Sequence, residues 1–168
     1  MANKSYILSN PGILLIKTEG GSYVPVGFTR GGITITPAKD IREIEADQSD
    51  YPLYYKTSRK SATIEFRLLE VTPENLKMAW GEPGKSGDSS GTVTLGVPES
   101  IPMVYSIKVY AQRMDGQYVI FEFTSCISTG AGAFTYSKTD EGVLEGRFQT
   151  TFDENLGGIG TFNVSSST

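Results

Sequence analysis

Short stretches in which apolar and polar side chains alternate constrain the fold of this chain more than any other feature. The clearest lies in residues 61–71. One side of this stretch carries four apolar residues, Ala62, Ile64, Phe66 and Leu68. The other side carries four polar residues, Ser61, Thr63, Glu65 and Arg67. Successive side chains of a strand point to opposite faces, so this stretch predicts a strand with one buried and one hydrated face.

Eight further runs have a similar β-rich composition. They are residues 12–17, 23–28, 33–36, 42–46, 92–95, 103–113, 118–127 and 143–152. In the last run we expect Leu144, Phe148 and Phe152 to share the buried face. Most of the 19 glycines and 8 prolines fall between the runs, and Asp115-Gly116 is a typical hairpin turn. The pattern predicts a mainly β fold, a sandwich or barrel of two packed sheets, in a single domain over residues 1–168.

One short helix is predicted to flank the sheets over residues 73–80. Thr72 suits the N-cap, Pro73 the first helical position, and Gly81 the residue after the end. We expect Trp80 to fill the core. Residues 81–91 are predicted to form a flexible Gly/Ser loop, and residues 163–168 a polar C-terminal tail. Gly84-Lys85-Ser86 does not complete a phosphate-binding motif, because Ala79 stands where the motif requires glycine.

The composition of the chain excludes most kinds of catalytic site. The chain has no histidine and one cysteine, Cys126, which excludes Ser-His-Asp triads, Cys-His pairs and histidine-ligated zinc. We therefore expect no enzymatic activity, no metal and no cofactor, with Cys126 a small buried side chain. The longest aliphatic run is residues 13–16, too short for a signal sequence or a membrane span. The expectation is synthesis in the cytoplasm without membrane insertion.

The negative charge of the chain is concentrated in one segment. Residues 40–50 contain five acids and one base, and this accounts for the whole net charge of −4. On an extended strand, Glu43, Glu45 and Asp47 would project from one face and Ile44 from the other. Such a line of acids predicts a solvated surface that repels polyanions.

The segment that follows combines tyrosines with basic residues. We predict a long loop here, about residues 47–60, with the composition of an interface. Its candidate contact residues are Asp50, Tyr51, Tyr54, Tyr55, Lys56, Arg59 and Lys60. Exposed tyrosines beside bases are typical of interfaces. A solvated, mobile loop is the alternative that this composition leaves open.

An ordered succession of motifs over residues 12–81 resembles one protein family. It comprises GFTRGGITIT at 27–36, IEADQSD at 44–50, TSR at 57–59 and EFRLLEVTPENL at 65–76. An acidic strand ending in Asp-Gln-Ser, a loop, a long strand and a Thr-Pro-Glu-Asn-Leu helix follow one another in this order. The succession is similar to that of the tail tube (major tail) proteins of tailed bacteriophages. The remainder of the chain agrees with this family only in its strand pattern and its size.

The resemblance implies a structural virion protein that forms stacked hexameric rings. In such tubes one sheet of each subunit joins its neighbours around a lumen, and the loop at 47–60 reaches an adjacent subunit. DNA passes through the lumen during ejection without specific binding, and tape measure and tail terminator or completion proteins are the further partners. The lumen-facing residues are then expected to be Glu43, Glu45 and Asp47, with Glu65 and Arg67 on the adjoining strand.

Two other functions fit the same residues. Tyr51, Tyr54 and Tyr55 could stack on sugars, as in a carbohydrate-binding β-sandwich module of a phage adhesion or bacterial surface protein. The tube of a phage-like secretion device or bacteriocin would have the same fold as a phage tail tube.

Overall fold

The computed structural model describes residues 8, 12–45, 51–81, 102–130, 133–136 and 141–165. Several expectations lie outside these residues. They concern the side chains of Asp47 and Asp50, the loop at 82–91, the strand at 92–95 and the tail at 166–168.

The described strands form one antiparallel sheet with the order β2-β1-β5-β6-β8-β4-β3, in which β7 also pairs with β8 and β9 with β6. Their bounds are β1 Ile13–Thr18, β2 Val24–Pro25, β3 Thr29–Ile44, β4 Tyr54–Leu68, β5 Val104–Gln112, β6 Tyr118–Ser128, β7 Phe134–Thr135, β8 Val143–Thr150 and β9 Thr161–Ser165. The predicted run at 23–28 therefore contributes only the two residues of β2. The runs predicted at 33–36 and 42–46 belong to one continuous strand, β3.

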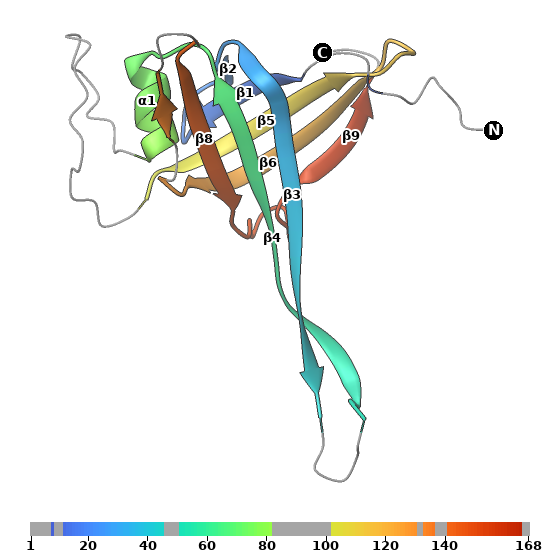
Figure 1. The fold of residues 1–168 in the computed structure, drawn as a ribbon. Coiled ribbons are helices and arrows are strands. Elements are labelled where there is room, and N and C mark those ends of the chain that lie inside the picture. The colour runs from blue at the N-terminus through green and yellow to red at the C-terminus, as the bar shows by residue number, and fades with distance from the viewer. Residues whose placement is uncertain are drawn as a thin grey trace.

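The sheet folds over at β6 into two layers that enclose the core. β6 pairs with β9 along Tyr118–Glu122 and with β8 along Cys126–Ser128, so its partner changes along its length. The strands β8, β4 and β3 cross the layer of β1, β5 and β6 at a steep angle (Figure 1). Leu14, Ile107 and Cys126 from one layer and Ile64 and Phe148 from the other are almost completely buried. The predicted mainly β fold with one short helix is confirmed, but the two layers belong to one continuous sheet and not to two separate sheets.

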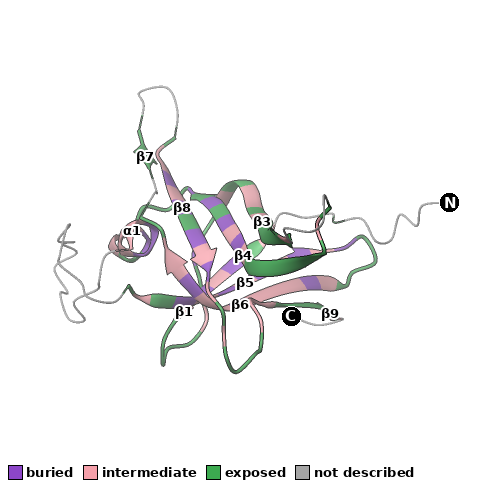
Figure 2. Ribbon diagram, turned by 90° about the horizontal axis from the view of Figure 1, so that it is seen from below, coloured by how far each residue is buried: buried purple, intermediate pink, exposed green. Residues whose placement is uncertain are grey.

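Alternation along the strands produces this core. Ala62, Ile64, Phe66 and Leu68 are all buried, as predicted. Buried and more exposed positions alternate along residues 61–68 of β4 and along β8 (Figure 2). The expectation for Phe152 is wrong, because its side chain is 64% exposed. β8 ends at Thr150, whose buried hydroxyl accepts a hydrogen bond from the Ala62 N–H at 2.7 Å, and residue 152 no longer follows the strand alternation.

The helix α1, Pro73–Trp80, has the predicted bounds. The Thr72 hydroxyl accepts a hydrogen bond from the Asn75 N–H at 3.2 Å and so caps the helix, which ends before Gly81. The Asn75 amide also donates to the carbonyl of Val26 at 3.0 Å. Trp80 packs against the core, as expected, and α1 lies against β8 and β6.

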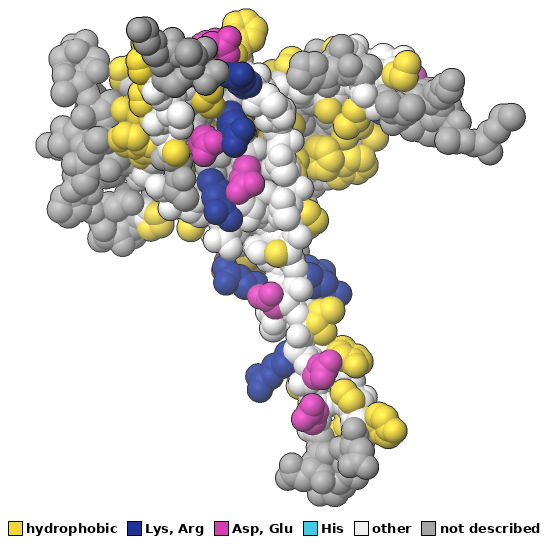
Figure 3. Space-filling model, viewed as in Figure 1, with side chains coloured by type: hydrophobic (Ala, Val, Ile, Leu, Met, Phe, Trp, Pro, Cys, Tyr) yellow, Lys and Arg dark blue, Asp and Glu magenta, His cyan; other side chains and the backbone are white. Residues whose placement is uncertain are grey.

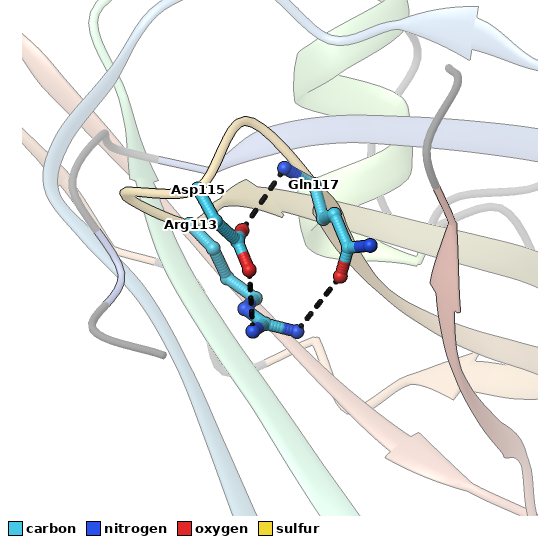
Figure 4. A network of polar contacts seen from close by, with 3 residues as sticks. All are labelled: Arg113, Asp115 and Gln117. Carbon is cyan, nitrogen blue, oxygen red and sulfur yellow. Dashed lines mark hydrogen bonds and ion pairs between the residues drawn. The ribbon is translucent and has the colours of Figure 1, made fainter. Parts of the chain in front are cut away.

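The predicted hairpin turn at Asp115-Gly116 joins β5 and β6. Gly116 has a φ of 82°, which favours glycine. Beside the turn, the Arg113 guanidinium contacts the Asp115 carboxylate at 2.6 Å and donates to the side-chain oxygen of Gln117 at 3.1 Å (Figure 4). The Asp115 carboxylate also accepts from the Gln117 N–H at 3.1 Å. Arg113 is only 8% exposed, so these bonds fix the shape of the turn.

Two predictions about irregular segments are wrong. Residues 54–60 of the predicted loop belong to β4, where they pair with residues 39–44 of β3. Tyrosine and threonine in this segment have the shape and branching that favour a strand. Residues 163–165 of the predicted polar tail belong to β9, which pairs with β6 and packs Phe162 against Phe121 with ring centroids 5.1 Å apart.

Candidate functional site: an exposed arm and a charged sheet face

The ribbon of β3 and β4 continues well beyond the body of the protein. β8 pairs with β4 only from Thr63 to Leu68, whereas the pairing of β3 with β4 goes on to Ile44 and Tyr54. We call the extension, residues 38–44 and 54–61, the arm. Among the described residues no third strand pairs with it, and it projects away from the sheet (Figure 1). An isolated two-stranded ribbon is marginally stable in water, so the arm would gain stability from any element that packs on it.

The arm exposes large apolar side chains. Ile41 is 56% exposed, Tyr54 57% and Tyr55 63%, and the neighbouring Leu53 is 60% exposed. Yellow side chains follow the arm towards its end (Figure 3). Exposed groups of this kind mark interaction surfaces when they lie close together. Tyr51, which was predicted for the same contact, is also exposed and lies just before the arm's second strand.

The arm also places like charges opposite each other. Lys39 lies opposite Lys60, and Arg42 lies opposite Lys56. Like charges in directly opposed positions destabilise a strand pair. Neither these four cations nor Arg59 forms an ion pair within the part of the chain that the structure describes. Arg59 lies opposite Asp40, whereas the other four cations have no acid opposite them, and their charge is available to an anionic partner.

A second candidate surface is the polar face of β4 and β8, which we call the charged face. It carries three ion pairs: Glu65–Arg147 at 3.1 Å, Arg67–Glu145 at 2.8 Å and Arg30–Glu141 at 3.0 Å. Dark blue and magenta side chains alternate here (Figure 3). The residues of the first two pairs, with Arg30, Gly31 and Gly32, line a shallow groove of ≈350 Å³. Gly31 and Gly32 have φ angles of 76° and 87°, which allow the bulge of β3 at the groove's edge.

The residues predicted for the lumen lie in two separate places. Glu43 and Glu45 are exposed at the far end of the β3 strand, whereas Glu65 and Arg67 belong to the charged face of the body. Strand alternation puts Glu43 on the ribbon face of Ile35, while Glu65 lies opposite Thr34 on the other ribbon face. The structure therefore does not bring these four residues onto one continuous surface.

Four residues of the charged face were not among the predicted site residues: Arg30, Glu141, Glu145 and Arg147. A signal for two of them exists in the sequence. Glu-x-Arg occurs at 65–67 and again at 145–147. Two antiparallel strands with this same motif place each glutamate opposite an arginine when the motifs are in register, and β4 and β8 have this register.

On the other layer, a smaller cluster has a structural role. The Tyr23 hydroxyl donates to the Glu122 carboxylate at 2.8 Å, and Lys108 contacts the same carboxylate at 3.1 Å. The Lys108 ammonium lies 4.4 Å from the centre of the Tyr23 ring. Burial and the neighbouring carboxylate raise the pKa of Tyr23, so the hydroxyl stays protonated and holds the segment before β2 against β5 and β6.

Two further properties concern possible chemistry. Burial raises the pKa of the Cys126 thiol to about 12, so the thiol is unreactive at neutral pH, and its predicted burial is confirmed. Within the described residues, no group of three or more His, Cys, Asp or Glu side chains is placed to hold a metal ion. The helix in the same part of the chain is too short to cross a membrane.

No protein-family model matches this chain, and no curated protein matches it in sequence. Among solved structures, it is similar to a chain in the tail of an empty GTA particle, determined by helical refinement with C6 symmetry. The identity is 13%, the TM-score is 0.41, and the alignment covers 90% of this chain and 94% of the other. A similarity of this size establishes no common function.

Proposed function

We propose that this chain is a structural protein of a phage-like tail and assembles into stacked hexameric rings that form a tube for DNA. The arm is the observation that carries the proposal. It has exposed apolar side chains, unpaired cations within the described residues and no third strand. The order of motifs that resembles the tail tube family supports the same function.

In the proposed assembly, the arm of one subunit packs on the next subunit. A projecting element that contacts a different surface on its neighbour makes a head-to-tail contact, and such contacts close into a ring when the rotation allows it. Tyr51, Tyr54 and Tyr55 supply apolar area, and Lys56, Arg59 and Lys60 supply charge. Docking would remove the instability of the isolated ribbon and cover its exposed tyrosines.

The tube would also need a wall that does not retain DNA. Each phosphate that binds a basic wall adds salt-dependent affinity, so acidic or charge-balanced surfaces let a duplex pass. Glu65 and Arg67 of the body are proposed wall residues, and Glu43 and Glu45 would add negative charge at a separate place, the far end of the arm. The proposed partners are further copies of the chain, a tape measure protein and terminator proteins, in a virion tail.

Carbohydrate binding is the competing function. Sugar-binding aromatic residues usually line a concave site, whereas Tyr54 and Tyr55 stand on a projecting ribbon. This placement suits a protein contact better than a preformed sugar site.

Electron microscopy of the concentrated protein, combined with sedimentation velocity, tests the proposed function. Rings or tubes are the expected result, with a population that rises with protein concentration. Monomers at every concentration, particularly monomers that bind an array of glycans, would overturn the proposal and favour the carbohydrate-binding alternative.

A further inference from the structure

The charged face differs from the rest of the surface in having no exposed large hydrophobic side chain. Nineteen such side chains are exposed among the described residues, and none lies in 29–36, 61–68 or 143–150. These ranges are the parts of β3, β4 and β8 that form the layer lying across β1, β5 and β6. Apolar surface becomes covered when subunits associate, so a face without it is suited to remain in contact with water after assembly.

The position of this layer in the sheet limits where its polar face can point. β3 is the last strand of the sheet, and its second edge has no partner among the described residues. A long free edge is the natural place for the sheet of a neighbouring copy to continue. The opposite face of the layer is the core, covered by β1, β5, β6 and α1. If the layer continues around a ring, and if β1, β5, β6 and α1 lie on the outside of that ring, the charged face points into the bore.

The charges of this face are balanced pair by pair. Each of Arg30, Arg67 and Arg147 lies 2.8–3.1 Å from a glutamate. Arginines without these glutamates would bind phosphates. Glutamates at all of these positions would instead face one another across β4 and β8 and destabilise the strand pair. Ion pairs avoid both effects, because they hold the strands together and leave no net charge.

From these observations we infer that the charged face is the wall along which DNA moves, and that Glu65, Glu141 and Glu145 keep its arginines from capturing phosphate. The inference rests on the proposed function and adds to it the extent of the wall, with Arg30, Glu141, Glu145 and Arg147, and the role of these carboxylates. It assigns the wall to ion-paired side chains of the body, separate from the acids at the end of the arm.

The first test locates the face in assembled tubes. Cys126, the single cysteine of the chain, is fully buried, so an added cysteine can be labelled selectively. Thr34→Cys places a thiol in the groove of the charged face, and Glu74→Cys places one on the exposed side of α1. Each variant is treated with N-ethylmaleimide and with a maleimide carried on a globular protein, before and after assembly.

In tubes, the Thr34→Cys variant is expected to react with N-ethylmaleimide but not with the bulky reagent, while the Glu74→Cys variant reacts with both. Reaction of the Thr34→Cys variant with the bulky reagent at the same rate in tubes and in monomers would overturn the inference and leave the proposed function standing. Protection from both reagents would overturn it as well, because the face would then be a subunit contact. Failure of the unmodified chain to form any ring or tube overturns the proposed function itself.

The second test measures the role of the carboxylates. The triple variant Glu65→Gln, Glu141→Gln, Glu145→Gln frees three arginines, and its matched control Glu19→Gln, Glu74→Gln, Glu154→Gln removes three exposed acids elsewhere. Both carry the same net charge. Tubes confirmed by electron microscopy are sedimented with a short fluorescent duplex. If the triple variant does not assemble, Glu65→Gln alone against Glu19→Gln gives the same comparison with a smaller increase.

The triple variant is expected to retain about tenfold more duplex than the unmodified tube at about 50 mM salt, and to release it by about 200 mM, because phosphate contacts weaken steeply with salt. The control is expected to behave like the unmodified tube. Equal retention by the two triple variants would show that net charge, and not the pairing of these arginines, governs DNA binding, and would overturn the assigned role of the glutamates.

Discussion

β3 and β4 run through both the body and the arm of this protein, yet their side chains have opposite surroundings in the two regions. In the body, β4 lies between β3 and β8, its apolar side chains are buried, and all five ion pairs of the described residues are found. In the arm, the same two strands have no third strand within the described part of the chain. Their tyrosines are exposed, and four of their cations lie opposite one another in two pairs.

This difference shows which interactions each region requires. The core of the body and the arginines of its charged face find partners inside the chain. The arm has the composition of an interface and the geometry of an unfinished sheet. Changes in the body should therefore be measured as losses of stability, whereas changes in the arm should be measured as losses of assembly.

Removal of the arm is expected to have the largest effect. Joining Ala38 to Ser61 through an Asn-Gly turn leaves the part of the ribbon that packs on β8. The shortened chain should fold, with a free energy of unfolding within about 1 kcal/mol of the full chain, because none of the described residues among those deleted is buried. Rings and tubes should be absent from electron micrographs at any concentration. Tubes formed by the shortened chain would show that assembly uses another surface.

Removal of one buried ring should have the next largest effect. Phe148 is fully buried, stacked on Phe66 with centroids 5.8 Å apart and in edge contact with Tyr105 at 5.4 Å. Phe148→Ala is expected to lower the free energy of unfolding of the monomer by about 3–5 kcal/mol. The matched arm variant, Tyr55→Ala, should change it by less than about 0.5 kcal/mol. Urea denaturation at low protein concentration measures both, and similar losses in the two variants would contradict the division between body and arm.

A smaller effect is expected where the arm leaves the body. The Ala62 N–H donates to the Thr150 hydroxyl at 2.7 Å in a buried position. Thr150→Val keeps the shape of the side chain but removes the acceptor, so a loss of about 1–3 kcal/mol in the free energy of unfolding is expected. Thr57→Val on the exposed arm is the control and should be nearly neutral. Hydrogen exchange of the Ala62 amide should become faster in the Thr150→Val variant, and an unchanged rate would contradict the assigned bond.

The sequence contains enough to predict the body but not the arm. Alternation at 61–68 and the cap at Thr72 with Gly81 depend on neighbours in the chain, and both predictions were correct. The arm was missed because Tyr54–Lys60 has no buried face, so hydrophobic periodicity gives no sign of its pairing with β3. The exposure of Phe152 depends on where β8 ends, and that end, at Thr150, lies beside Ala62 of a strand far away in the sequence.

The charged face shows how much of a site can be predicted once the strand order is known. Glu-x-Arg occurs in the sequence at 65–67 and at 145–147, and the alternation at 61–68 places the first motif on a polar strand face. That the two strands are neighbours depends on long-range packing, because 77 residues separate Arg67 from Glu145 along the chain. Arg30 and Glu141 carry no such motif, and only the fold brings them to the same face.

The smallest expected effect concerns the stability of the ion pairs on the charged face. Arg67 and Glu145 are 63% and 38% exposed, so water and salt screen their attraction. Glu145→Gln should lower the free energy of unfolding by no more than about 1 kcal/mol. A double-mutant cycle with Arg67→Gln, at low and high salt, isolates the pair and should give a coupling that falls as salt is added. The counterpart on the arm is Lys60→Glu, which turns the opposed Lys39 and Lys60 into an attractive pair and should stabilise the ribbon slightly. If the arm uses these cations to contact a neighbour, the same change should weaken assembly. A coupling between Arg67 and Glu145 that is large and independent of salt would contradict the comparison, because the body would then depend on these pairs for its stability.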